Sequence, residues 1–308
     1  MQSALEKLTI GIPVYNDAKY IRLAIESCLN EGGKIVVSDN ASTDGTSEIC
    51  AEFARSHPHL THLRQAENIG AFENFKQLLF SCNTEYFAWF GSHDLLAPGY
   101  SLPLLAALER DPSAVLAVGT IQHIGEKGEI LKRVTRTAWA DQTNDSNPLK
   151  RVGVCVAKLR DCFIFYGIFR TKDAREAWMD IPSLGFDRVM IIRAAGIGKI
   201  VYVPESTFYA RDFNLTRDSK RDQERRTFEL VKNQQKPLPK TLFTRNMEMV
   251  KAVLALAKTP EDLTLALKIV DKINRRFQNR RYYQKLRLMW AAVAFALVVV
   301  LFLSLHPF

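Results

Sequence analysis

The chain has 308 residues, 47% of them hydrophobic, which is enough for one large α/β domain with appendages or for two small domains. Its formal net charge of +9 favours an anionic partner, and nucleic acid, anionic lipid and a phosphorylated substrate all qualify. The five cysteines are scattered and include no C-x-x-C pair, which argues against a disulfide framework and against a zinc site.

The first 120 residues alternate between short apolar runs and helical patterns. The apolar runs predict strands at 8–14, 34–38, 61–64, 86–90 and 114–121, and the residues between them predict helices near 21–29, 46–56, 72–81 and 102–110. Repeated strand–helix units of this kind build a mostly parallel, doubly wound α/β sheet. Such a sheet binds its ligands outside the carboxyl ends of its strands.

The rest of the chain is less regular. Residues 122–150 are polar and rich in turn formers, so the strand–helix pattern breaks down there. A helix near 187–195 and a strand at 199–203 follow, and then a highly charged stretch at 213–235. A helical pair is expected next, at 241–257 and from Thr259 onward, where threonine can cap the second helix and a proline fits its first turn.

The C-terminal residues predict a membrane anchor. Positions 288–305 carry no charged residue. The length of this segment is at the short end of what spans a bilayer core. Seven Lys and Arg residues lie between 272 and 287, beside Tyr282 and Tyr283. A basic flank with interfacial aromatics predicts a single span in the inner membrane with the main domain in the cytoplasm. The alternative is a core helix of a soluble protein.

Two further features bear on location and partners. The N-terminus has no basic and apolar signal-peptide pattern, which also keeps the main domain in the cytoplasm. The basic cluster before the apolar segment explains much of the net charge, and no DNA- or RNA-binding pattern accompanies it. Nucleic acid is therefore not an expected partner.

Polar segments follow four of the predicted strands, at 13–16, 38–46, 67–70 and 91–98. Each one alone could be an ordinary turn or helix cap. Four of them at one edge of one sheet are better explained by a ligand site. Neither G-x-G-x-x-G nor G-x-x-x-x-G-K-[ST] is present, so a dinucleotide site and a P-loop lose their main support.

These motifs resemble glycosyltransferase family 2, whose members have the Rossmann-like GT-A fold. The resemblance covers residues 8–120 closely and 160–211 more loosely, with Ala41 standing where the family usually has glycine in D-N/D-G-S-T-D-G-T. It implies that Asp39 hydrogen-bonds the pyrimidine base of the donor and that the turn beside Pro13 frames the nucleoside. On this basis the residues expected to bind the nucleotide-sugar are Pro13, Tyr15, Asn16, Asp39, Asn68, Gly70, Ser92, Asp94 and Arg211.

The fourth strand end departs from the family pattern. Members usually carry a D-x-D there, and matching the proline at position 98 puts Gly91, Ser92 and His93 at those positions. The last of the three normally ligates the divalent metal that holds the diphosphate, so the resemblance implies His93 and Asp94 as metal ligands. Histidine can bind Mn²⁺, whereas Mg²⁺ prefers oxygen. Two other interpretations remain open: basic residues replace the metal, or the site is inactive.

The resemblance also identifies a general base. In the family an acid at a helix start precedes a G-K-x-x-Y-V-P strand, and Asp187 holds that position, although it could simply cap its helix. Arg211 lies in a Tyr-Ala-Arg segment like the family's Tyr-Arg region and would stabilise diphosphate charge. Phe165-Tyr166-Gly167 is expected on the acceptor side. Three histidines are expected at the surface, away from the ligand edge: His57, His59 and His62.

Together these features predict an inverting glycosyltransferase with a divalent metal, Mn²⁺ or Mg²⁺, as cofactor. The expected organisation is a GT-A domain at 1–212 (nucleotide half 8–121, acceptor half 122–212), a charged helical linker at 213–287 and a transmembrane helix at 288–305. A sugar would pass from a nucleotide-sugar, preferably UDP-linked, to a glycan or lipid-linked acceptor near the membrane in cell-surface polysaccharide synthesis. The alternative is a catalytically inactive, sugar-nucleotide-binding scaffold of the same fold.

Overall fold

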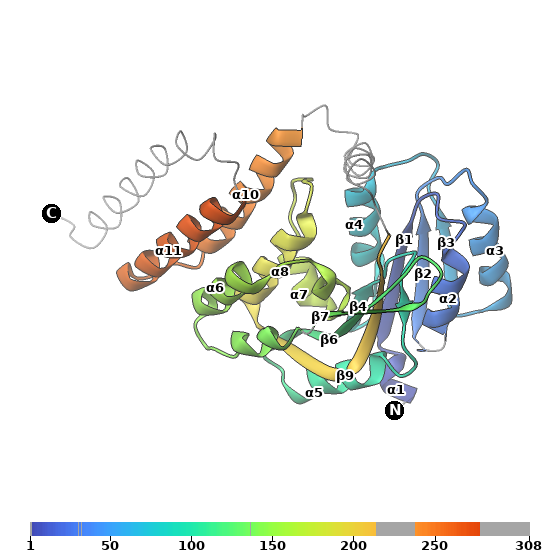
Figure 1. The fold of residues 1–308 in the computed structure, drawn as a ribbon, viewed down its shortest axis with the longest axis horizontal. Coiled ribbons are helices and arrows are strands. Elements are labelled where there is room, and N and C mark those ends of the chain that lie inside the picture. Colours follow the sequence, from blue (N-terminus) through green and yellow to red (C-terminus); the bar gives the residue numbers. More distant parts are fainter. Residues whose placement is uncertain (1, 30, 32, 136, 214–237, 278–308) are drawn as a thin grey trace.

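The computed structural model describes residues 2–29, 31, 33–135, 137–213 and 238–277, which form an α/β fold around one mixed sheet (Figure 1). The strands of this part are β1 (Leu8–Val14), β2 (Lys34–Asp39), β3 (Leu60–Arg64), β4 (Tyr86–Trp89), β5 (Leu95–Leu96), β6 (Ala114–Ile124), β7 (Ile130–Thr135), β8 (Ile168–Arg170) and β9 (Lys199–Arg211). Its helices are α1 (Gln2–Leu5), α2 (Ile21–Leu29), α3 (Thr46–Ser56), α4 (Ala71–Ser81), α5 (Ser101–Arg110), α6 (Pro148–Lys158), α7 (Thr171–Ala177), α8 (Phe186–Ile197), α10 (Leu238–Leu254) and α11 (Pro260–Phe277), with short 3-10 helices η1 (Ala138–Thr143) and η2 (Phe163–Tyr166).

The sheet has the strand order β3-β2-β1-β4-β8-β6-β9-β5, and β7 pairs with β6. The first four strands in this order run parallel, as expected. The other half is mixed: β8 runs antiparallel to both β4 and β6, whereas β6 and β9 are parallel. The expectation of a mostly parallel sheet is therefore correct only for the N-terminal half. The reversing strand β8 has three residues, too few to show a hydrophobic period in the sequence.

The predicted elements of the N-terminal half are confirmed with small differences in their ends. β1 and α3 have the predicted bounds, and β1 is buried along its whole length because helices cover both faces of the sheet. One helical layer packs its apolar side chains with β1 into a core cluster that includes residues of α2, α3 and α5. The other cluster joins the opposite face of the sheet to α4, α6, α7, α8, α10 and α11.

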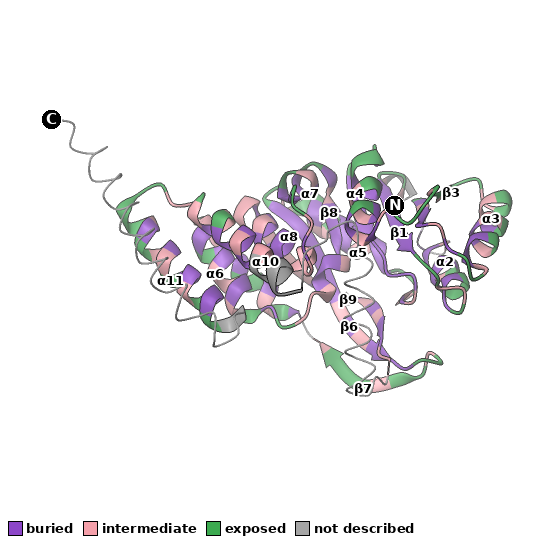
Figure 2. Cartoon of the chain, turned by 90° about the horizontal axis from the view of Figure 1, so that it is seen from above, coloured by how far each residue is buried: buried purple, intermediate pink, exposed green. Residues whose placement is uncertain are grey.

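The largest differences from the predicted elements lie in β6, β7 and β9. β6 continues to Ile124 and forms a hairpin with β7, inside the stretch where the pattern breaks down. β7 lacks an apolar pattern because most of its side chains are exposed at the edge of the molecule (Figure 2). β9 is 13 residues long and irregularly paired with β6, and the Ser206 carbonyl lies so close to Gly119 that a Cβ there would collide with it.

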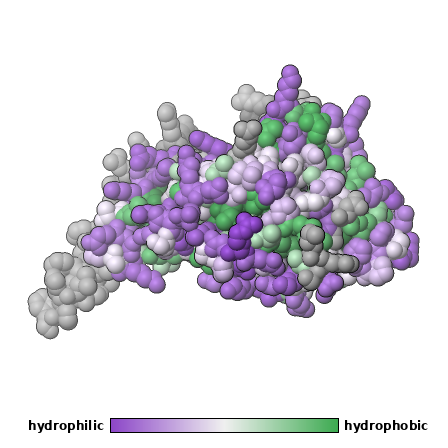
Figure 3. Space-filling view, turned by 90° about the horizontal axis from the view of Figure 1, so that it is seen from below, coloured by the Kyte–Doolittle hydropathy of each residue, from purple (hydrophilic) through white to green (hydrophobic). Residues whose placement is uncertain are grey.

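The two C-terminal helices pack on the domain. α10 contacts α8, α11 contacts α6, and Met249, Val253 and Ile273 are buried in the same core cluster as those helices. α11 begins as predicted, because the backbone N–H of Asp262 donates to Thr259 Oγ1 at 3.1 Å. Seen from below, polar side chains cover much of this face, with apolar areas between them (Figure 3).

Across the described ranges, no helix combines the length and the apolar character needed to cross a bilayer. The predicted span at 288–305 lies outside the described residues, as do its basic flank from 278 onward and most of the charged stretch at 213–235.

Candidate active site

The turns after β1 and β2 are joined by hydrogen bonds. The backbone N–H of Asn16 donates to Ser42 Oγ at 2.9 Å, and the Asn16 side chain accepts from the backbone N–H of Thr43 at 2.8 Å. Asn16 and Ala41 both have positive φ, of 51° and 62°. Tyr15 is 37% exposed beside them. The predicted segments therefore meet at one edge of the sheet, with Tyr15 open to a ligand.

Asp39, the predicted base-binding residue, is fully buried at the end of β2. Its Oδ1 accepts from the backbone N–H of Ser42 at 2.9 Å, whereas its Oδ2 has no hydrogen-bond partner among the described residues. His62 Nε2, which likewise has no hydrogen-bond partner among them, lies 3.7 Å from that oxygen, beyond a normal hydrogen bond. A buried acceptor without a partner is rare, and it marks Asp39 as a place where a ligand donor would gain most.

His62 was expected at the surface, away from the ligand edge, and that expectation is wrong. Its side chain is 11% exposed, and its strand pairs with β2 so that His62 is opposite Val37. Paired residues on neighbouring strands point to the same face of a sheet, so Val37 and His62 share a face. Side chains two residues apart in one strand also share a face, so Asp39 lies on the same side as His62. Burial lowers the pKa of His62, and the charge of Asp39 only partly offsets that effect.

The third predicted segment is tied to the second. Asn68 Oδ1 accepts from the Asn40 side chain at 2.8 Å and from the backbone N–H of Gly70 at 2.9 Å. The backbone N–H of Ile69 returns a bond to Asn40 Oδ1 at 2.9 Å. Gly70 has φ 84°, a value that favours glycine. Asn68 and Gly70 thus shape the rim of the site through the turn after β2.

The loop after β4 carries the irregular fourth motif, and Asp17 reaches it from the turn after β1. Ser92 Oγ donates to Asp17 Oδ2 at 2.5 Å, and His93 Nδ1 lies 3.3 Å from the same oxygen. Burial lowers the pKa of His93, but the hydrogen bond to Asp17 and the charges of Asp94 and Asp17 outweigh it and raise that pKa overall. Asp17 was not among the predicted residues, since one aspartate in a turn is indistinguishable from a helix cap.

Asp94 is buried behind this loop. Its Oδ1 accepts from the backbone N–H of Arg211 at 2.8 Å, and a Cβ at Gly91 would collide with its Oδ2. The Asp94 carboxylate therefore occupies space that a side chain at position 91 would need. Burial raises the pKa of Asp94, against the opposing effects of His93 and Arg211.

Arg211 fastens the end of β9 to this loop. Its Nε donates to the His93 carbonyl at 2.6 Å, and its Nη1 donates to the carbonyls of Gly125 and Glu126 at 2.9 and 2.8 Å. The guanidinium lies 4.8 Å from the Tyr20 ring centroid, and its buried Nη2 has no hydrogen-bond partner in the part of the chain that the structure describes. Nε and Nη1 already donate to backbone carbonyls, so Nη2 is the nitrogen that could stabilise the diphosphate charge, as predicted for Arg211.

The expected metal near His93 would require several ligand atoms from nearby side chains. No group of three His, Cys, Asp or Glu side chains is arranged to hold a metal ion among the residues with described positions. His93 still suits a metal ligand, because a neutral ring that donates from Nδ1 to Asp17 has Nε2 available as a ligand atom. A carboxylate on the other ring nitrogen is the usual support of a metal-binding histidine. With one imidazole and Asp94, the donor's phosphates would complete the ligand set, as is common for Mg²⁺.

Asp187, the predicted base, lies in the first turn of α8. Its Oδ1 accepts from the backbone N–H of Arg188 at 2.8 Å. It interacts with Cys162 and Tyr166: burial raises the pKa of both groups, and the negative charge of Asp187 raises them further. Asp94 acts on the same Tyr166 hydroxyl. The charges of Asp94 and Asp187 therefore both act on Tyr166, a residue expected on the acceptor side.

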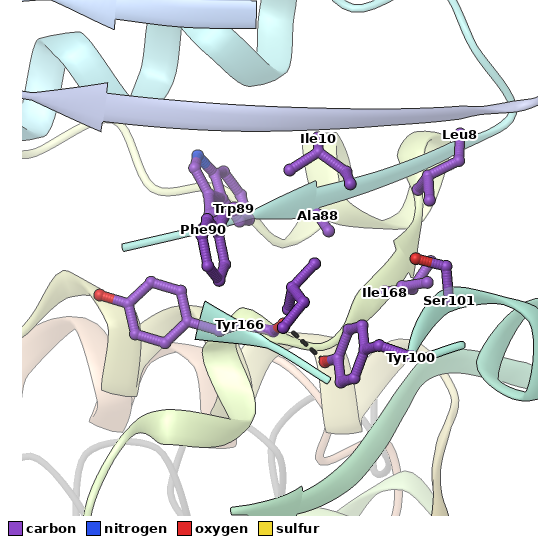
Figure 4. A pocket seen from close by; sticks show the side chains of 10 residues that line it. Leu8, Ile10, Ala88, Trp89, Phe90, Tyr100, Ser101, Tyr166 and Ile168 are labelled. Atoms are coloured by element: carbon purple, nitrogen blue, oxygen red, sulfur yellow. Dashed lines mark hydrogen bonds between the residues drawn. The ribbon is translucent and has the colours of Figure 1, made fainter. Parts of the chain in front are cut away.

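A small cavity lies in the core behind this region and is not the ligand site. It has a volume of about 10 Å³ and is lined mainly by apolar side chains such as Ile10 and Phe90. Tyr100 donates to the Tyr166 carbonyl at 3.0 Å at its edge, and the Tyr166 hydroxyl points away from it (Figure 4). The cavity has room for about one water molecule.

The geometry can be compared with known proteins. Residues 9–169, more than half of the chain, match the family described as Glycosyl transferase family 2. The chain belongs to glycosyl transferase family 2 and is therefore a glycosyltransferase. The match contains the four strand-end segments and ends before Asp187 and Arg211.

Individual relatives agree with the family. An uncharacterized protein of Mycobacterium tuberculosis is 31% identical over 201 residues, which are 62% of this chain and 55% of that protein. Chondroitin synthase of Escherichia coli is 30% identical over 128 residues, covering 40% of this chain and 18% of that protein. The chain thus spans about half the length, or less, of these curated relatives.

A solved structure supports the fold. The crystal structure of S. aureus TarS 1-349 in complex with UDP matches with a TM-score of 0.53 and 14% sequence identity, over 87% of this chain and 82% of that one. At this identity the likeness concerns the fold alone, and it confirms the expected GT-A-like α/β fold. The roles of individual residues stay predictions.

Proposed function

We propose that this chain is an inverting glycosyltransferase that moves a sugar from a UDP-linked donor to a glycan or lipid-linked acceptor near a membrane. The observation that carries the proposal is the convergence of the four strand-end segments with Arg211 at one edge of the sheet, within and beside the family match. The Escherichia coli relative is named a chondroitin synthase, which supports a role in polysaccharide synthesis.

The proposed donor site reads the base through Asp39. The acceptor that Asp39 leaves open, Oδ2, suits a base that offers a single ring N–H between two carbonyls, as uracil does. Guanine offers two adjacent donors, one of which would have to share Oδ1 with the backbone N–H of Ser42. The UDP complex of TarS is compatible with this choice at the level of fold.

At the diphosphate we propose a divalent metal held by His93 and Asp94, with Mn²⁺ preferred because imidazole is one of the ligands. When bound, such an ion neutralises charge on the departing diphosphate. Asp17 orients the His93 ring, and Arg211 fixes the loop through the His93 carbonyl. Nη2 of Arg211, which has no hydrogen-bond partner among the described residues, is proposed to donate to the diphosphate.

Asp187 is proposed to take the proton of the acceptor hydroxyl. As the acceptor oxygen bonds to the anomeric carbon, the bond from that carbon to the donor phosphate oxygen breaks, and the configuration inverts. The nucleoside diphosphate leaves with the bonding electron pair, and the proton remains on Asp187. The charges of Asp94 and Asp187, one from each proposed half of the site, both raise the pKa of Tyr166.

The proposed location is the inner membrane, with the catalytic domain on the cytoplasmic side. The support is the uncharged segment 288–305 and the basic residues before it, which lie outside the described residues. Fractionation of cells and salt extraction of the membranes would test this, because a spanning segment resists salt whereas a peripheral, charge-bound protein is released.

The activity is tested with the purified full chain and a panel of UDP- and GDP-sugars, measuring nucleoside diphosphate release with and without Mn²⁺. We expect turnover of at least one UDP-sugar and none of the GDP-sugars. An Asp187→Asn variant that folds and binds UDP should lose at least about 100-fold in turnover. Wild-type turnover by that variant would reject the base, and UDP binding without turnover by the natural chain would favour a scaffold, which the Gly91-Ser92-His93 departure suggests.

A further inference from the structure

The helix α10 places an arginine beside the proposed base. Gly185, with φ 80°, precedes α8, and a Cβ at this glycine would be 2.9 Å from Arg245 Cδ and 3.2 Å from Arg245 Nη1. The same point lies 3.8 Å from Asp187 Oδ1. The absence of a side chain at position 185 thus lets the guanidinium of Arg245 approach the start of α8, where Asp187 is.

The guanidinium is held in a defined orientation. Its Nε and Nη2 donate to Asn246 Oδ1 at 3.3 and 3.2 Å, and Nη1 is the nitrogen nearest to the position of the missing Cβ at Gly185. Burial and the nearby charge of Arg188 lower the pKa of Arg245, whereas Asp187 and Cys162 raise it. Arg245 and Asp187 therefore attract each other at partly buried positions.

Arg188, which follows Asp187 on α8, is directed elsewhere. Its Nη1 donates to the Leu159 carbonyl at 3.1 Å and its Nη2 to the Arg160 carbonyl at 3.4 Å. These bonds anchor α8 to the end of α6. Arg245 is thus a cation that approaches the proposed base from a different element.

We infer that Arg245 is a positioning residue for Asp187, so that the helical pair α10–α11, outside the family-matched segment 9–169, completes the catalytic site. The inference rests on the proposed function, in which Asp187 is the base. A carboxylate that takes a proton from an acceptor hydroxyl works best when its position is fixed, because small displacements of a catalytic group lower the reaction rate steeply. A guanidinium that attracts the carboxylate while its other nitrogens are held by Asn246 can supply that restraint.

The test uses the purified full chain and UDP release from UDP-glucose, UDP-galactose and UDP-N-acetylglucosamine. We expect Arg245→Met to lower kcat about tenfold, with donor KM within about twofold of wild type. Arg245→Lys should recover part of the loss. Lys251→Met is the matched control: it lies on the same helix, its ammonium group pairs with Glu248 one turn away, and its loss should leave kcat unchanged.

A double substitution separates this role from a general effect on the fold. If Arg245 acts through Asp187, Arg245→Met causes no further loss in a chain that already carries Asp187→Asn. An equal loss in both backgrounds, a loss confined to KM, or an unchanged kcat in Arg245→Met would overturn the inference. Arg245→Gln, checked for UDP binding and melting temperature, replaces Arg245→Met if that variant does not fold.

The outcomes also separate this inference from the proposed function. A fully active Asp187→Asn variant would reject the base itself, whatever Arg245 does. An inactive Asp187→Asn variant together with a fully active Arg245→Met variant would leave the proposed base in place and reject only the positioning role.

Discussion

Asp17 Oδ2 lies 3.3 Å from His93 Nδ1, so the turn after β1 supplies a carboxylate to the loop after β4. The aspartates of the usual D-x-D are absent from that loop, where Gly91, Ser92 and His93 stand instead. The contact orients the imidazole, and a neutral ring that donates from Nδ1 would have its other nitrogen available to a ligand. An acidic group from a distant segment thus supports the histidine predicted to stand at the family's metal-ligating position.

The first prediction concerns this contact. Asp17→Asn should lower the apparent affinity for Mn²⁺ about 10- to 100-fold, because the carboxylate partners of metal-binding histidines contribute that much to metal affinity. Ser92→Ala, which removes only the hydroxyl bond to Asp17, is the control and should shift the affinity less. The measurement is UDP release over a Mn²⁺ titration. Identical titration curves for wild type and Asp17→Asn would contradict the proposed role of His93.

The second prediction concerns Ala41, which has φ 62° at a position where the family usually has glycine. A side chain in the left-handed region costs about 1–2 kcal/mol, and glycine gives back about 0.4–1 kcal/mol through the entropy of the unfolded chain. Ala41→Gly should therefore raise the free energy of unfolding by up to about 1 kcal/mol, as measured by urea denaturation.

The matched control for Ala41 is Gly45, in the same turn. It has φ 96°, and apart from its two chain neighbours no described residue has an atom within 4 Å of the point that a Cβ would occupy, so Gly45→Ala tests backbone strain without a steric clash. It should lower the free energy of unfolding by about 1 kcal/mol or more. Two substitutions with the same sign would show that backbone conformation does not decide stability in this turn.

The third prediction concerns Gly91. Gly91→Ala places a methyl group against Asp94 Oδ2, so the carboxylate must move. We expect turnover to fall by about tenfold or more while the fold persists, because the displaced group belongs to the proposed diphosphate site. Gly153→Ala is the control, since a Cβ there meets only ordinary contacts at 3.5 Å and beyond, from Ile269. UDP release at the wild-type rate by Gly91→Ala would show that the position of Asp94 is unimportant.

The fourth prediction concerns pH and His62. Its pKa in the folded protein lies below the ordinary value of 6.5, so folding favours the neutral imidazole. The stability from this group is fully present above pH 6.5 and is lost as the pH falls through the lowered pKa. His62→Gln should flatten the decline of melting temperature with acid, whereas His59→Gln, at an exposed position, should not. A decline that is unchanged in His62→Gln would show that other groups cause it.

Much of the fold and of the donor edge could be predicted from the sequence. Strand β1 and helix α3 were predicted with their observed ends, because long periodic runs of apolar residues reflect burial on a sheet or a helix face. The turn residues Asn16, Asn68 and Gly70 could be assigned to one edge, since the carboxyl ends of parallel strands meet there. Local chemistry and period were sufficient for these features.

Other features were decided only by tertiary structure. Three relationships join segments that lie far apart in the sequence: the contact of Asp17 with His93, the contact of His62 with Asp39, and the approach of Arg245 to Gly185 before α8. No local period encodes such contacts, because they depend on which strands pair and how α10 lies on α8.

The direction of β8 could not be predicted for the same reason: three residues carry no periodic signal, and only the structure shows that the strand pairs antiparallel with β4 and β6. The sequence by itself determined the family and the donor edge, because local motifs and apolar periods are written in neighbouring residues. The packing of distant segments determined which charges stand beside that edge, because only strand register and helix packing bring those segments together.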